Sequence, residues 1–176
     1  ILAQAAILSN NYPEVSAFPS FGTERRGAPV QAFIRISNSP IWARSHIKQA
    51  DIMLVLDETV FGGPVISRVK DDGTVIINTW KCPADIRAEY PFGDKKITII
   101  TSDLTQIAFD LALTNRENHP IVNTTVLGVL TRIDLKISME DLGNAIKEQF
   151  GEGPKTEMNI KGAKMAADSA VIGEVG

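Results

Sequence analysis

Cysteine and histidine are scarce in this chain, which excludes several kinds of site. The single cysteine, Cys82, allows no internal disulfide and cannot by itself hold an iron–sulfur cluster or a structural zinc ion. The two histidines, His46 and His119, do not have helical metal-ligand spacing, so we expect ordinary structural or surface residues. A lone thiol suits a reducing compartment, and we therefore expect a cytoplasmic protein.

Long apolar runs and an excess of positive charge are also missing. No apolar stretch reaches the roughly 18 residues that span a bilayer, so we expect no membrane contact. The formal net charge is −3 and the lysines and arginines are scattered, which argues against nucleic-acid binding. The sequence contains no nucleophile elbow of the Gly-x-Ser-x-Gly type, no phosphate-binding Gly-rich loop with Lys-Ser/Thr and no complete Gly-x-Gly-x-x-Gly fingerprint.

What is present is an alternation of strand-like and helix-like apolar segments, which predicts an α/β fold. At 176 residues the chain suits a single domain with one well-formed core. We expect a three-layer α/β/α architecture with a mostly parallel sheet, plus a C-terminal helical tail. Strands are predicted over residues 30–36, 52–56, 75–78 and 97–101. Helices are predicted over residues 1–8, 58–70, 83–90, 103–113, 122–133 and 138–150.

Several local signals refine these elements. Gly62, Gly63 and Pro64 are expected to delay the helix over 58–70, and the Asp-Asp-Gly sequence at 71–73 predicts a turn. The β-branched residues of 122–133 leave a strand possible there. Ser138 and Asp141 form a capping pattern for the helix that ends at Gly151. The tail helix after Pro154 is expected to pack weakly or against another subunit.

The segment from Phe18 to Ser37 is the most distinctive in the sequence. Two prolines and two glycines exclude a helix, and the charged triplet Glu24-Arg25-Arg26 lies between them, before a strand. One interpretation is a solvated turn whose arginines pair with nearby carboxylates. The other is an anion site, because arginine suits bidentate recognition of phosphate or carboxylate and Gly27 lets a ligand approach the backbone.

Two other places in the sequence are candidate chemical sites. Cys82 precedes Pro83 and could be a reactive thiol at a helix start, but a partly buried small apolar residue is the favoured interpretation. Asp57 and Glu58 follow a strand, at the edge where open α/β sheets bind ligands. We favour loop and helix-cap roles for both acids over an acid/base pair.

Four blocks of sequence resemble one family. They are Phe18 to Ile41, Asp51 to Thr59, Asp72 to Thr79 and Asn123 to Leu130. In this order they are similar to the gamma subunit, or the fused gamma domain, of 2-oxoacid:ferredoxin oxidoreductases of the pyruvate synthase type. The resemblance covers most of the chain, and its first block is the most specific.

The resemblance implies an accessory, non-catalytic subunit of an oxidoreductase. Such complexes oxidatively decarboxylate a 2-oxoacid on thiamine diphosphate with Mg²⁺, pass electrons through iron–sulfur clusters (4Fe–4S) to ferredoxin, and in most members form an acyl-coenzyme A. The implied partners are alpha, beta and delta subunits, with ferredoxin reached through the complex, and this chain alone binds none of the cofactors. By the same resemblance, Arg25, Arg26, Gly27 and Asn123 are the candidate residues for coenzyme A or another anionic ligand.

The resemblance also suggests how the chain is organised. Residues 1–151 correspond to the gamma-type α/β domain and 152–176 to a helical tail or linker. Members carry a strand and a Gly-rich turn before the first helix, so we expect these to precede Ile1. A free-standing α/β module that binds a nucleotide or metabolite stays an alternative, as does a purely structural subunit. The oxoacid stays open, because other subunits select it.

Overall fold

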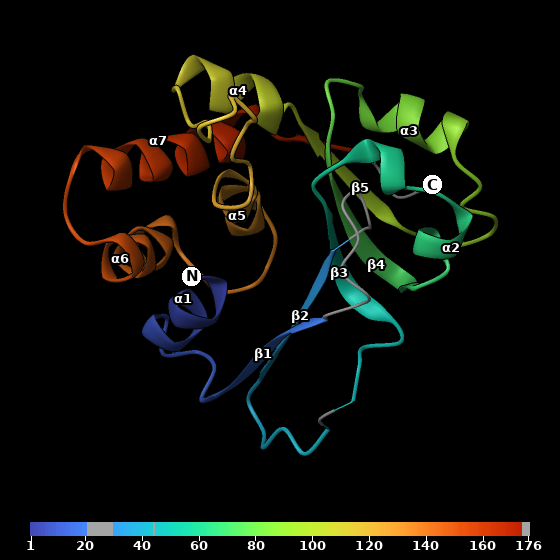
Figure 1. Ribbon diagram of the computed structural model, residues 1–176. Helices are drawn as coiled ribbons and strands as arrows, with labels where there is room; N and C mark the ends of the chain where they lie inside the picture. The colour runs from blue at the N-terminus through green and yellow to red at the C-terminus, as the bar shows by residue number, and fades with distance from the viewer. Residues whose placement is uncertain (21–29, 44, 174–176) are drawn as a thin grey trace.

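The structure is a computed structural model that describes residues 1–20, 30–43 and 45–173. Its elements follow one another in an α/β order, which confirms the predicted fold class (Figure 1). They are α1 (Leu2–Leu8), β1 (Glu14–Ser20), β2 (Gln31–Ser37), β3 (Ala50–Val55), the 3-10 helix η1 (Glu58–Val60), α2 (Gly63–Ile66), β4 (Val69–Asn78), α3 (Pro83–Glu89), β5 (Thr98–Ser102), α4 (Leu104–Asp110), α5 (Thr125–Val129), the 3-10 helix η2 (Leu130–Arg132), α6 (Met139–Phe150), α7 (Pro154–Ser169) and β6 (Val171–Ile172).

The main sheet has four strands in the order β3-β4-β5-β6. β4 pairs in parallel with both β3 and β5, while the two-residue strand β6 pairs antiparallel to β5. The sheet is therefore mostly parallel, as predicted. β1 and β2 form a separate antiparallel pair, and the sequence reasoning predicted β2 but not β1.

Both faces of the sheet are covered by helices, because successive residues of a strand point to opposite sides. Val75 and Ile77 of β4 belong to a buried cluster that includes Ile86 of α3. Ile76, between them, belongs to a larger cluster that includes Leu104 of α4. Figure 1 shows α2 and α3 on one side of the sheet and α1 with α4 to α7 on the other. This arrangement confirms the three-layer α/β/α architecture.

The helix starts follow the capping signals in the sequence. The Ser138 hydroxyl accepts a hydrogen bond from Asp141 N at 3.1 Å, and the Asp141 carboxylate accepts one from Ser138 N at 2.8 Å. This reciprocal pair satisfies backbone donors that the first turn of α6 leaves free. Asp103 caps α4 in a similar way by accepting from Gln106 N at 2.9 Å. Within the predicted helix 122–133, residues 125–132 are helical, as α5 and η2, and not a strand.

Two predictions around α2 and β4 are wrong in detail. The segment 58–70 forms only the short helices η1 and α2, and its last apolar residue, Val69, begins β4. The turn expected at 71–73 is an irregularity inside β4: between Ala50 and Ile52, β3 advances two residues while β4 advances five. The extra residues bulge out of the ladder, with Asp72 at a φ of 59°. The Asp-Gly signal thus marked a left-handed backbone rather than a chain reversal.

The tail helix packs closely, which corrects the expectation of weak packing. Ala163 and Ala166 of α7 are fully buried. A Cβ atom on Gly128 of α5 would lie 2.8 Å from Ala163 Cα and still nearer its carbonyl group, so the glycine permits the two helices to approach.

The helix α4 ends at Asp110, earlier than the predicted Leu113, although Leu113 is itself buried.

A membrane-crossing helix would need both length and an apolar composition. No helix in the described ranges combines the two.

Candidate functional site

A β-hairpin carries the segment that the sequence singled out. β1 and β2 pair antiparallel with Ser20 opposite Gln31, so residues 21–30 connect the two strand ends. The predicted ligand residues Arg25, Arg26 and Gly27 belong to this connection and lie outside the described residues. The structure describes the strands that flank them.

One face of the hairpin is covered by an aromatic cluster. Phe18 and Phe33 are cross-strand partners whose ring centroids lie 5.5 Å apart. His46, from the loop after β2, lies edge-on at 5.9 Å from the Phe18 ring and 5.5 Å from the Phe33 ring. Cross-strand aromatic pairs stabilise a two-stranded ribbon, and the imidazole attaches the following loop to it. His46 therefore has the structural role that the sequence suggested.

Two arginines cover this cluster. The Arg35 guanidinium lies 5.6 Å from the Phe18 ring centroid and donates to Ser45 O at 2.6 Å. The Arg68 guanidinium lies 5.7 Å from the Phe33 centroid. Neither forms an ion pair with a carboxylate among the described residues. Arg35 Nη1 is buried without a hydrogen-bond partner in the same part of the chain.

The hairpin and its following loop also differ from the rest of the chain in charge. Residues 14–49 contain five Lys or Arg and two Asp or Glu, a formal charge of +3, although the whole chain carries −3. A local positive field attracts anionic ligands or acidic protein surfaces. This part of the molecule is therefore the better candidate for binding an anion.

The carboxyl ends of β3 and β4 border a second candidate region. A hollow of about 410 Å³ lies there, lined by Leu56, Asp57, Glu58, Asn78, Thr105, Pro120 and Val122. Open α/β sheets bind ligands at this edge. The predicted ligand residue Asn123 follows Val122 and is exposed. No hydrogen bond joins Asn123 to a described residue of the hairpin, and the other predicted ligand residues lie outside the described ranges, so the joint site stays a prediction.

Several polar groups of the hollow already have partners within the chain. Asp57 Oδ1 accepts hydrogen bonds from Thr59 Oγ1 at 2.7 Å and from Thr59 N at 2.9 Å, and these two bonds hold the pKa of Asp57 below its ordinary value. Asn78 Nδ2 donates to Leu56 O at 2.9 Å and to Thr105 Oγ1 at 3.0 Å. Asp57 is thus a helix cap, which is the role that the sequence favoured for it. Asn78 links the ends of two strands.

Glu58 belongs to a charged network beside the hollow. Lys81 Nζ lies 2.6 Å from both Glu58 Oε1 and Glu89 Oε2, and the Tyr90 hydroxyl donates to Glu58 Oε1 at 3.2 Å. Burial raises the pKa of Glu58, but hydrogen bonds from Lys81, Thr79 and Tyr90 outweigh burial, so its net pKa is lowered. The hydrogen bonds from Lys81 to Glu58 and Glu89 raise the pKa of that lysine. Glu58 is therefore an ionised structural partner rather than a proton donor.

The favoured interpretation of Cys82 is wrong, because this thiol is exposed. Cys82 precedes the first residue of α3, and the Asp85 carboxylate accepts from its backbone N at 3.3 Å and from its Sγ at 3.0 Å. Helix caps lie at the surface, where the chain enters the helix. Within the described ranges, no three His, Cys, Asp or Glu side chains gather as ligands for a metal ion.

Comparison with known proteins identifies the family. The family described as pyruvate ferredoxin/flavodoxin oxidoreductase matches residues 1–169. The chain belongs to this family. It is 37% identical over 176 residues to the "Pyruvate/ketoisovalerate oxidoreductases common subunit gamma" of Pyrococcus furiosus, covering 99% of this chain and 90% of that protein. It is 41% identical over 132 residues to the "Pyruvate synthase subunit PorC" of Methanosarcina barkeri, covering 74% and 67% respectively.

A solved structure of the same family has the same fold. The crystal structure of pyruvate oxidoreductase subunit PORC from Thermotoga maritima superposes with a TM-score of 0.79 at 26% identity, covering 98% of this chain and 88% of that one. A keto/oxoacid ferredoxin oxidoreductase gamma subunit from Geobacter sulfurreducens, at 19% identity and a TM-score of 0.67, shares the fold. These findings confirm the resemblance that the four sequence blocks indicated.

Proposed function

We propose that this chain is the accessory gamma subunit of a cytoplasmic 2-oxoacid:ferredoxin oxidoreductase complex. In this proposal the alpha, beta and delta subunits hold thiamine diphosphate, Mg²⁺ and the iron–sulfur clusters, which supply the decarboxylation and electron-transfer chemistry. This chain shapes the site and the subunit contacts, and it offers cations to coenzyme A or another anionic ligand. The observation that carries the proposal is the match to proteins named as gamma or PorC subunits over 99% and 74% of this chain.

The residues of this chain support such a division of work. A single cysteine cannot ligate an iron–sulfur cluster, so electron transfer needs groups on other subunits. Coenzyme A is strongly anionic at its nucleotide end. The hollow at the carboxyl edge does not fit that charge, because Asp57 and Glu58 line it. The hairpin fits it better, since residues 14–49 carry a formal charge of +3.

Replacing Arg25 with Ala in the assembled complex tests the ligand role. A charged hydrogen bond contributes about 1.5–3 kcal/mol, so KM for coenzyme A should rise roughly ten- to a hundredfold while KM for the oxoacid changes little. The control is Arg116→Ala, which removes the same charge from an exposed loop and should change neither constant. Equal increases in both KM values would contradict the ligand role and leave a packing role for Arg25.

A free-standing α/β module that binds a nucleotide or metabolite is the alternative, and the 410 Å³ hollow at the carboxyl edge favours it. Size-exclusion chromatography of the native protein separates the two functions. A monodisperse monomer near 19.1 kDa would contradict the subunit proposal, whereas co-elution with larger partners would contradict the free-standing module. A purely structural subunit predicts that coenzyme A binding to the assembled complex does not respond to Arg25→Ala.

A further inference from the structure

Arg68 joins the four-stranded sheet to the hairpin. It lies between α2 and β4, where its backbone carbonyl accepts a hydrogen bond from Ala50 N at 2.8 Å. Its backbone is therefore fixed at the start of the parallel ladder. Its side chain reaches across to the hairpin: Nη1 donates to Gln31 Oε1 at 2.9 Å and Nη2 donates to Ile47 O at 3.3 Å. The same guanidinium lies over the Phe33 ring.

The two ends of the hairpin are held by different parts of the molecule. At the end that follows α1, Val15 and Ile36 pack against the larger buried cluster. Each strand has seven residues, so the opposite end, at Ser20 and Gln31, lies roughly 20 Å away. A two-stranded ribbon of that length is marginally stable alone. The bond to Gln31 acts at this second end, next to the segment that joins the strands.

We propose that Arg68 is a positioning residue that sets the direction of the hairpin relative to the four-stranded sheet. The inference rests on the proposed function, because the predicted ligand residues lie in the sequence between Ser20 and Gln31, the paired strand ends at which Arg68 binds. Arginine suits the task, since a planar fork can donate to two acceptors while stacking on a ring. Arg68 acts through Gln31, Ile47 and Phe33, so we expect its effect on turnover to be indirect.

Neighbouring contacts also connect the hairpin to Arg68, through the loop that follows β2. His46 packs on Phe18 and Phe33, and Arg35 donates to Ser45 O, so the loop after β2 lies against the hairpin face. Arg68 binds this loop at Ile47 O and the hairpin at Gln31. Because one guanidinium holds both, its removal should free the Ser20–Gln31 end without opening the aromatic cluster.

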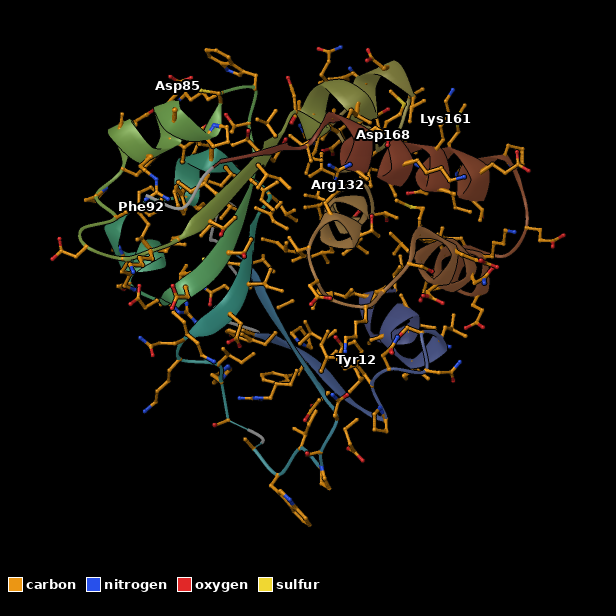
Figure 2. All side chains as sticks on the ribbon, turned by 180° about the vertical axis from the view of Figure 1, so that it is seen from behind. Tyr12, Asp85, Phe92, Arg132, Lys161 and Asp168 are labelled. Atoms are coloured by element: carbon orange, nitrogen blue, oxygen red, sulfur yellow. The ribbon has the colours of Figure 1, made fainter. Side chains whose placement is uncertain are left out.

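The test compares Arg68→Ala and Arg68→Lys with wild type in the assembled complex. Arg87→Ala is the matched control, because Arg87 also lies over an aromatic ring, that of Phe92 (labelled in Figure 2), and donates to the backbone carbonyl of Ile97. Among the described residues, its hydrogen bond and its ring contact involve no hairpin residue. Amide hydrogen exchange of Gln31 to Phe33 reports hairpin opening. KM for coenzyme A and kcat report function, and the thermal midpoint reports global stability.

With Arg68→Ala we expect exchange of Gln31 to Phe33 to accelerate about fivefold, the loss expected for one hydrogen bond. KM for coenzyme A should rise about fivefold with kcat nearly unchanged, and Arg68→Lys should recover part of both. Arg87→Ala should move only the thermal midpoint. Unchanged exchange in Arg68→Ala would overturn the positioning role, whatever the kinetics show.

Kinetic outcomes separate this inference from the proposed function. If Arg25→Ala raises KM for coenzyme A while Arg68→Ala accelerates exchange but leaves KM unchanged, the ligand role stands and the positioning role is overturned. If Arg25→Ala leaves KM unchanged, the ligand role fails. In that case, faster amide exchange in Arg68→Ala, with the exchange rate unchanged in Arg87→Ala, would still support the link between the sheet and the hairpin.

Discussion

Gly128→Ala provides a sharp test of how the C-terminal helix is packed. Gly128 lies in α5 against Ala163 of α7, and both residues are buried. An alanine Cβ would lie 2.8 Å from Ala163 Cα and closer still to the carbonyl carbon and oxygen of that residue. These are backbone atoms, so no side-chain rotation can relieve the clash. The two helices must separate by roughly 1 Å or more to restore ordinary contact.

The free-energy cost follows from two opposing effects. Inserting a methyl group into a packed interior costs about 1–3 kcal/mol, and more where backbone must move. Alanine regains about 1 kcal/mol of helix propensity over glycine. Because the clash involves backbone and would also loosen Ala166, we expect Gly128→Ala to lower the free energy of unfolding by about 2–4 kcal/mol. For a chain of this size, the thermal midpoint should fall by roughly 5–12 °C.

Gly143→Ala is the matched control for this measurement. Gly143 lies in the adjacent helix α6, and an alanine Cβ there would meet only the Ile160 side chain, at 3.9 Å. The propensity gain is then unopposed, and stability should rise by up to about 1 kcal/mol. Circular dichroism melts of both variants are expected to shift in opposite directions. A Gly128→Ala variant as stable as wild type would refute the close packing of α5 on α7.

Two further predictions concern the carboxyl edge of the sheet. The exposed Cys82 should react with a thiol reagent in the folded chain at one thiol per molecule, and protection of the thiol would contradict its exposure. Cys82→Ser should abolish labelling. It should also raise the free energy of unfolding by up to about 1 kcal/mol, because serine is a better helix cap. Since the folded pKa of Glu58 is lowered, its ionised form stabilises the fold above pH 4.5 and this contribution is lost as pH falls through the folded pKa. Urea unfolding should show wild type more stable than Glu58→Gln at neutral pH, with the difference shrinking below pH 4.5; a difference that is constant with pH would contradict the network.

The sequence predicted best those elements whose signals are local. α6 was placed almost to the residue, because its Ser138–Asp141 box and the terminating Gly151 act within a few positions of the chain. β5 and the end of β4 were predicted equally well, since a strand buried on both faces is a continuous apolar run. In each case the residues that cause the element are the residues inside it.

The elements that were missed depend on partners far away in the sequence. β1 contains Pro19 and has little alternation, and it is a strand because β2 pairs with it. The segment Asp71 to Gly73 reads as a turn, yet β3 pairs with Val69 before it and with Thr74 after it, so the segment is a bulge within β4. α2 ends before Val69, because Val69 pairs in parallel with Ala50 and therefore belongs to β4. Tertiary pairing outweighed local propensity at all three places.

The same distinction decides what the sequence could say about the site. The charged triplet Glu24-Arg25-Arg26 near Gly27 was recognisable because its charges and the glycines are neighbours in the chain. The link between Arg68 and Gln31 gave no signal, because 37 residues separate the two partners and each is an ordinary polar residue. The structure also weakens the case for an anion at the carboxyl edge, since Glu58 and Asp57 are both held ionised there. On the hairpin face, Arg35 and Arg68 form no ion pair with a described carboxylate. Under the proposed function, we expect an anionic ligand or an acidic companion surface to bind at the hairpin, and we expect residues that hold the hairpin in place, such as Arg68, to affect that binding.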